Sequence, residues 1–313
     1  MFIMTEQENI SSKESDLIAF DRNAMAELIN QRMKIRQNAK IGDSLWDLKK
    51  INKSRDVKKF EKIDREQNDL IAMSSKTGID NTAALDQLDD KKLDLLHKKP
   101  KLSKKLSARH NAENNIADVK KQLVRATLDK RRSVIDKLVE NYDWRAADAN
   151  AQTIKNEIFT LFDHDLYRQA KNYENIGGTE KEKLLMELSH RMAKARQLDS
   201  TWAFSFEDLS KQTGYSAMYY WNDSYNFGGT KNYTDGNLAV IDAAHETNHR
   251  YQKFKKASLS VTMTDLSRKN YIPKKLDPDY YRRNPLELES YAVNSLLSDT
   301  NFLKELAESR GWE

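Results

Sequence analysis

The sequence contains no cysteine among its 313 residues. Disulfide bonds and thiolate metal ligands are therefore excluded, which leaves histidine and carboxylate side chains as the strong ligands for a metal ion. A chain without cysteine is typical of a protein made in a reducing cytoplasm.

Long apolar runs are also absent, and none approaches the roughly 20 residues that a membrane-spanning helix needs. The first residues, Met-Phe-Ile-Met-Thr-Glu-Gln-Glu, include neither a basic segment nor a sustained apolar core, so no Sec-type signal is expected. We expect a chain that is cytoplasmic as made, without a membrane span. Translocation into a target or host cell by a specialised secretion system would leave no such mark and remains an alternative.

Glycine and proline are scarce in the first part of the chain. Residues 1–176 contain only Gly42, Gly78 and Pro100, whereas seven glycines and three prolines follow. Because both residues interrupt regular elements, the front half is predicted to be helical and the rear half more varied. The expected fold class is mainly α (α+β). Three stretches place apolar residues at helical spacing: Leu17, Met25, Leu28, Ile29 and Met33; Val134, Ile135, Leu138, Val139 and Tyr142; Ile154, Ile158, Leu161, Phe162 and Leu166.

Charge is unevenly distributed along the chain. Residues 91–132 contain fourteen Lys and Arg against four acidic residues, whereas residues 151–313 contain 22 basic and 23 acidic residues. The basic segment could bind nucleic acid, an anionic membrane surface or an acidic protein partner. It has almost no aromatic residues, so stacking on nucleic-acid bases is not supported. The alternative is a solvated helical face or a linker.

The chemistry of the chain is concentrated in one short motif, His245-Glu246-x-x-His249. On a helix, the two histidines lie one turn apart on the same face and can bind one ion. Glu246 lies about 100° round the helix, outside the ligand set but within reach of a metal-bound water. The apolar run that precedes the motif predicts a buried helix. Two solvated surface histidines are the alternative.

Two glutamates that follow the motif are candidates for the third ligand. Pro285 is suited to the first turn of a helix, which places Glu287 and Glu289 near its start. They project about 200° apart on a helix and therefore cannot both point at one ion. Glu289 shares its face with apolar residues and Glu287 with polar ones, so burial alone leaves both open.

Three parts of the sequence together resemble the zincin metallopeptidases that have glutamate as third ligand. They are the His-Glu-x-x-His motif, Arg-Tyr-Gln at residues 250–252 and Asn-Pro-Leu-Glu-Leu-Glu-Ser at residues 284–290. The similarity is strongest to compact bacterial versions among phage-encoded, polymorphic-toxin and effector proteins, and it covers roughly residues 215–300. It implies a zinc-dependent endopeptidase in which His245, His249 and Glu287 hold Zn²⁺. Glu246 is then the catalytic base, and Glu289 orients one histidine.

The change in composition and the position of the proposed ligands indicate a division of the chain. We expect a helical, charge-rich targeting or interaction region at residues 1–150 and a zincin-like catalytic domain with a small sheet at residues 151–313. Short strands are predicted at 217–221 and 225–227, and the edge of one would receive an extended substrate. The connection 253–279 is expected to be a helix end and then a loop along the cleft. Tyr291 or Tyr251 would hydrogen-bond the oxyanion.

Two other functions fit parts of the sequence. A His-x-x-x-His pair also ends the motif of ββα-metal nucleases, but that motif needs an upstream histidine as general base. The nearest candidates, His190 and His164, lie inside predicted helices. The second alternative is a non-catalytic interaction scaffold on a zincin fold, in which the helical front half is the working part. Loss of Glu246 would indicate such a scaffold, and Glu246 is present.

Overall fold

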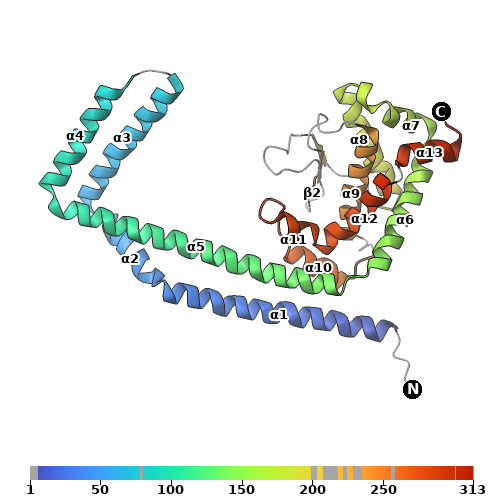
Figure 1. Cartoon of the computed structure of the whole chain (residues 1–313), viewed down its shortest axis with the longest axis horizontal. Coiled ribbons are helices and arrows are strands. Elements are labelled where there is room, and N and C mark those ends of the chain that lie inside the picture. The colour runs from blue at the N-terminus through green and yellow to red at the C-terminus, as the bar shows by residue number, and fades with distance from the viewer. Residues whose placement is uncertain are drawn as a thin grey trace. The chain divides into compact units, whose positions relative to one another are not determined.

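A computed structural model describes residues 6–77, 80–198, 203–206, 218–220, 224–227, 235–254, 258–299 and 301–312, with only the backbone described for 6–11 and 218–220. The expected fold class is confirmed at the coarse level, because the described chain is mainly helical with one small sheet (Figure 1). Its helices are α1 Glu6–Asn38, α2 Ile41–Ile51, α3 Arg55–Thr77, α4 Thr82–Lys98, α5 Pro100–Glu140, α6 Trp144–Leu161, α7 His164–Lys171, η1 Tyr173–Asn175, α8 Gly178–Ala195, α9 Gly236–Phe254, α10 Val261–Lys269, α11 Pro278–Arg282, α12 Pro285–Asp299 and α13 Phe302–Arg310. No helix in these ranges is long and apolar enough to span a membrane.

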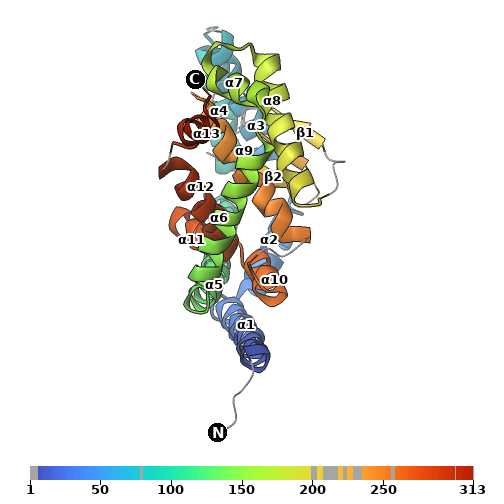
Figure 2. The same cartoon turned by 90° about the vertical axis from the view of Figure 1, so that its right-hand side faces the viewer.

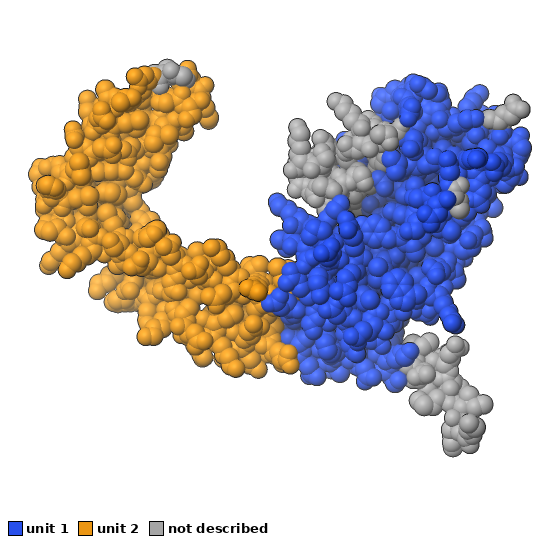
Figure 3. All heavy atoms as spheres, in the orientation of Figure 1, with its two compact units in different colours: residues 1–25, 129–313 blue, residues 26–128 orange. Residues whose placement is uncertain are grey.

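The chain forms two compact units (Figure 3). Unit 1 consists of residues 1–25 and 129–313, and unit 2 consists of residues 26–128. The expected division at residue 150 does not coincide with this boundary, because residues 129–150 and the start of the chain pack with the metal-motif region. Unit 2 contains 24 Lys and Arg against 15 Asp and Glu, and unit 1 contains 29 against 33. The basic excess therefore belongs to unit 2.

Unit 2 has a small core of its own. Helix α3 packs against α4, and Ile51, Val57 and Leu102 are buried together. The stripe predicted over residues 17–33 is packed only in part. Leu28 is buried, whereas Ile29 and Met33 are more than half exposed, at 52% and 53%.

Four helices of unit 1 form a bundle in which α6, α8, α9 and α12 each pack against two of the others (Figure 2). Helix α9 is buried as its apolar sequence predicts, and Ala239, Val240 and Ala243 lie in the main core. Gly236 is required where α9 begins. A β-carbon there would lie 1.9 Å from the carbonyl oxygen of Ala170, so glycine permits the close approach of α9 to α7.

The sheet has three strands in the order β1-β3-β2: β1 Ala203–Ser205, β2 Met218–Tyr220 and β3 Ser224–Asn226. β2 and β3 are the two strands predicted from the sequence and pair antiparallel, and β1, which was not predicted, pairs parallel to β3. Tyr225 and Phe227 are fully buried against Phe204. Several aromatic residues of this region, including Trp202, Tyr215 and Tyr233, lie outside the described residues.

A second core cluster explains why residues 129–150 belong to unit 1. Val134, Leu138 and Tyr142 from α5 and the turn after it are buried with Leu17 of α1 and with four residues that lie near the metal motif: Leu259, Met263, Leu266 and Leu286. Met263 and Leu266 come from α10, which occupies a stretch that was expected to be a loop. Ser260 caps this helix by accepting a hydrogen bond from the Met263 amide at 3.1 Å.

A buried polar cluster joins the same segments. Lys130 of α5 donates to Asp21 of α1 and, at 2.7 Å, to Asn270 at the end of α10. Lys269 also donates to Asp21, at 2.5 Å. Burial by itself raises the pKa of Asp21, but the hydrogen bonds from Lys130 and Lys269 lower it below its usual range. Asp21 therefore stays ionised and holds three distant segments together.

We predict that Asp21→Ala destabilises unit 1 by about 3–5 kcal/mol, because it leaves the buried ammonium of Lys130 without its carboxylate. Asp16→Ala, an exposed change on the same helix, is the control. Denaturant unfolding at neutral pH measures the difference. Because the pKa of Asp21 is lowered on folding, this contribution is present above the ordinary carboxyl pKa and disappears as the pH falls through the lowered value. Equal stability of the two variants would contradict the role given to the cluster.

Candidate metal centre

Helix α9 holds the two histidines of the motif at van der Waals distance from each other. Both are buried, at 6% exposure for His245 and 9% for His249. Their rings are nearly perpendicular, at 81°, and their Nε2 atoms lie 3.1 Å apart. The two nitrogen atoms therefore converge on one point, as expected for residues one turn apart on a helix.

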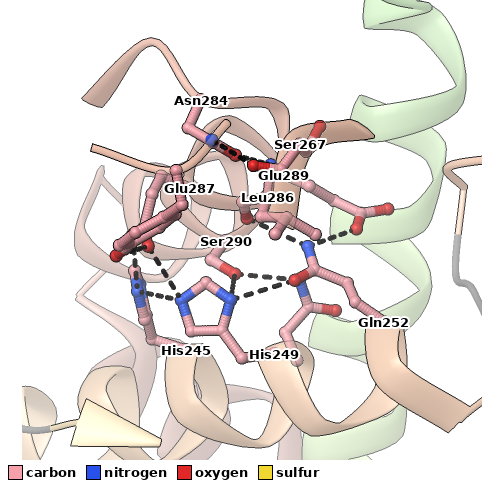
Figure 4. Close-up of polar contacts among 11 residues, drawn as sticks. His245, His249, Gln252, Ser267, Asn284, Leu286, Glu287, Glu289 and Ser290 are labelled. Carbon is pink, nitrogen blue, oxygen red and sulfur yellow. Dashed lines mark hydrogen bonds and ion pairs between the residues drawn. The ribbon is translucent and has the colours of Figure 1, made fainter. Parts of the chain in front are cut away.

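Helix α12 supplies the carboxylate. Pro285 opens the helix, and the Asn284 side chain accepts a hydrogen bond from the Leu286 amide at 3.0 Å while donating to the Ser267 carbonyl at 3.0 Å. This start places Glu287 in the first turn, facing α9. Its Oε2 lies 3.6 Å from Nε2 of His245, and its Oε1 lies 3.6 Å from Nε2 of His249 (Figure 4).

These three side chains fit a tetrahedral metal ion. Zinc bonds of about 2.0–2.2 Å place neighbouring ligand atoms about 3.3–3.6 Å apart in a tetrahedron. Here the two histidine nitrogens lie 3.1 Å apart, and each lies 3.6 Å from a different oxygen of Glu287. Within the described ranges, His245, His249 and Glu287 are the one group of three or more such side chains close enough to share an ion. Glu287 Oε2 is also buried without a hydrogen bond in this part of the chain, which suits an oxygen that faces a cation.

The negative charge of Glu287 and a positive charge on His249 stabilise each other. Burial by itself raises the pKa of Glu287, but the nearby His249 lowers it below its ordinary range. Burial likewise opposes protonation of His249, but the Glu287 carboxylate raises the pKa of His249 to about 9. Glu287 is therefore an anion, and the centre favours a positive charge beside it.

Glu246 lies on α9 between the two histidines and is buried, at 6% exposure. Burial is the main reason why its pKa is raised above the ordinary carboxyl value, and the neighbouring histidines oppose that shift. A carboxylate with a raised pKa is suited to accepting a proton and later donating it.

The two candidate glutamates have separate surroundings. Glu287 joins the histidines, whereas Glu289 is fully buried and accepts hydrogen bonds from Gln252, Ser258 and Asn150. The expected contact between Glu289 and a histidine is indirect. Gln252 lies between them, with Oε1 at 2.9 Å from His249 Nδ1 (Figure 4).

The two tyrosines expected near the oxyanion have different surroundings, and a third tyrosine contacts the centre. The ring of Tyr291 packs edge-on against His245 at 5.4 Å between ring centroids, and Tyr251 lies under the guanidinium of Arg196. A tyrosine hydroxyl that contacts the centre directly is that of Tyr271, which donates to Glu287 Oε1 at 2.8 Å. Sequence reasoning missed Tyr271 because it follows α10, in the stretch expected to be a loop.

The histidines required by a nuclease are elsewhere. His190 on α8 packs edge-on against Phe204, and His164 at the start of α7 packs against Trp312. Neither belongs to the group that can share an ion.

Comparison with protein-family models, with curated proteins and with solved structures finds no match for this chain. The function is therefore argued from the geometry of this centre.

We predict that the purified chain binds about one zinc ion, as a single set of three protein ligands implies. His245→Ala and Glu287→Ala should abolish tight binding, because each removes a ligand. Glu289→Ala should weaken binding by about 10–100-fold, as changes next to ligands do. Zinc analysis after dialysis, followed by competition titration, measures this, with His110→Ala in unit 2 as control. Failure of the wild type to bind added zinc, or a larger loss for Glu289→Ala than for Glu287→Ala, would contradict the assignment.

Proposed function

We propose that this chain is a zinc-dependent endopeptidase that hydrolyses peptide bonds of a protein substrate. The observation that carries the proposal is the convergence of His245 Nε2, His249 Nε2 and the Glu287 carboxylate at tetrahedral spacing, with Glu246 on the same buried turn of α9. This combination is the arrangement that the motif His-Glu-x-x-His supplies in zinc peptidases.

A bound zinc ion would polarise the scissile carbonyl and lower the pKa of a bound water toward about 7. The protein residues supply the remaining steps. Glu246 takes the proton of the attacking water and delivers it to the leaving amine, and its raised pKa suits both transfers. Tyr271 holds the Glu287 carboxylate through its hydroxyl.

The small sheet supports the binding of an extended peptide. β2 is an outer strand in the order β1-β3-β2 and contacts α9, the helix of the metal motif. The edge of such a strand can accept a peptide as a further strand through backbone hydrogen bonds. A peptide bound there would lie beside the helix that bears Glu246.

Unit 2 supports a role outside catalysis. It carries the basic excess of the chain, with 24 Lys and Arg against 15 acidic residues, and Leu45 and Trp46 on α2 are more than half exposed, at 54% and 61%. We propose that it targets the peptidase or recruits an acidic partner. A toxin or effector delivered by a specialised secretion system, as the resemblance implies, would need such a region.

We predict that Glu246→Gln keeps zinc and loses proteolysis by about 10²–10⁴-fold, because the amide cannot accept the proton of the attacking water. Wild type and variant are incubated with bacterial or host lysate proteins, and new amino termini are mapped by mass spectrometry. Asp265→Asn, which changes an exposed carboxylate of α10, is the control. Equal cleavage by Glu246→Gln, or no cleavage by zinc-loaded wild type with any lysate, would favour the non-catalytic scaffold.

A further inference from the structure

We propose that Glu289 and Gln252 fix the tautomer of His249, by a chain of hydrogen bonds with only one possible direction. The chain holds a proton on Nδ1 and leaves the lone pair of Nε2 facing the metal centre. This inference rests on the proposed zinc site and adds two positioning residues to it.

Glu289 lies at one end of this series of hydrogen bonds and is held in place by several donors. It is fully buried, and its Oε1 accepts hydrogen bonds from the Ser258 amide at 2.9 Å, from the Ser258 hydroxyl and from Asn150 Nδ2 at 3.1 Å. Carboxylate oxygens accept hydrogen bonds, and the other oxygen of Glu289, Oε2, faces the side-chain amide of Gln252.

Gln252 is oriented by what surrounds its amide nitrogen. Nε2 lies 2.6 Å from Glu289 Oε2 and 2.9 Å from the carbonyl oxygen of Leu286. Both neighbours are acceptors, so the nitrogen must face them, and a flipped amide would bring three oxygens together. Gln252 is completely buried, so water does not relieve such a conflict.

The orientation of Gln252 determines that of the proton on His249. The amide oxygen of Gln252 lies 2.9 Å from Nδ1 of His249, and an oxygen without a hydrogen can only accept. Nδ1 must therefore carry the proton, and Nε2 of the neutral ring is bare. Nε2 is the atom that faces His245 and Glu287.

The two histidines of the motif differ in the hydrogen bonding of their Nδ1 atoms. Nδ1 of His245 is buried without a hydrogen bond in the described part of the chain, whereas Nδ1 of His249 also has the Ser290 hydroxyl at 3.4 Å. That hydroxyl accepts a hydrogen bond from the side-chain amide of Asn248 at 3.1 Å, and it is the more distant neighbour of Nδ1, since the Gln252 oxygen lies at 2.9 Å. His249 is thus the ligand whose orientation is set before metal binds, since neighbours of this kind fix ring and tautomer.

The proposal can be tested in the full-length protein by exchanging the hydrogen-bond donor at Gln252 with the acceptor at Glu289. Gln252→Glu removes the donor that faces Glu289, and Glu289→Gln places an amide where Gln252 and Ser258 both donate. Each single change should weaken Zn²⁺ affinity by about 10–100-fold. The double variant restores alternating donors and acceptors from residue 289 to His249, but it leaves the Leu286 carbonyl facing a carboxylate oxygen, so it should recover part of that loss. Gln152→Glu, on the exposed face of α6, is the control.

A second measurement addresses the tautomer without metal. In the metal-free wild type, at a pH above the raised pKa of His249 of about 9, the ¹⁵N shifts of the neutral ring should report a proton on Nδ1. In the zinc-loaded wild type and the double variant, that proton should be slow to exchange, and in both single variants it should exchange faster. This measurement on the wild type decides the matter even where a variant fails to fold.

Two outcomes would overturn the inference: a proton on Nε2 of neutral His249 in the wild type, or a double variant that binds zinc more weakly than either single variant. Both are independent of catalysis. A wild type that binds zinc and shows the Nδ1 proton but cleaves no protein would remove the proposed peptidase function and leave the positioning role of Gln252 and Glu289. A wild type that cleaves protein while its neutral His249 carries the proton on Nε2 would do the reverse.

Discussion

The packing of α12 against α9 is the contact on which the candidate site depends. The two histidines come from one turn of α9, but the carboxylate arrives from a helix that begins 36 residues after His249, at Pro285. Asn284 fixes where α12 starts, by bonding to both Leu286 and Ser267. A shift of α12 by one residue would rotate Glu287 by about 100° away from the histidines.

That packing brings several buried polar groups together, and each needs a partner. Glu289, Gln252, Asn248 and Ser290 are all buried at the same helix contact. Their hydrogen bonds offset the loss of water, and they have definite directions because carboxylates only accept and amides have distinct ends. In the proposed metal centre, the contact between α9 and α12 would therefore specify both the position of Glu287 and the tautomer of His249, which an apolar contact cannot do.

Local patterns in the sequence predicted the parts of this structure that depend on neighbours along the chain. The histidine spacing, the buried face of α9, the start of a helix at Pro285 and the strands at β2 and β3 follow from periods and capping residues. The choice between Glu287 and Glu289 did not follow from burial, since both are buried; the resemblance favoured Glu287, and the structure places Glu287 beside the histidines.

Features that depend on distant contacts were not predicted. Tyr271 reaches Glu287 only because α10 folds against α12, and its own neighbours in the sequence give no sign of this. The expected boundary at residue 150 missed the packing of Leu17 and Val134 against Leu259 and Met263. Those residues lie more than 100 positions apart in the sequence, and a periodic apolar stripe does not indicate which other stripe covers it.

The proposed zinc site can be tested by X-ray absorption at the zinc edge of the zinc-loaded, full-length protein. We predict a four-coordinate ion with two imidazole nitrogens and carboxylate or water oxygens at about 2.0–2.2 Å. The imidazole signal should fall to that of one ring in His249→Ala reconstituted with excess zinc. Zinc bound without imidazole ligands, or an unchanged imidazole signal in His249→Ala, would contradict it.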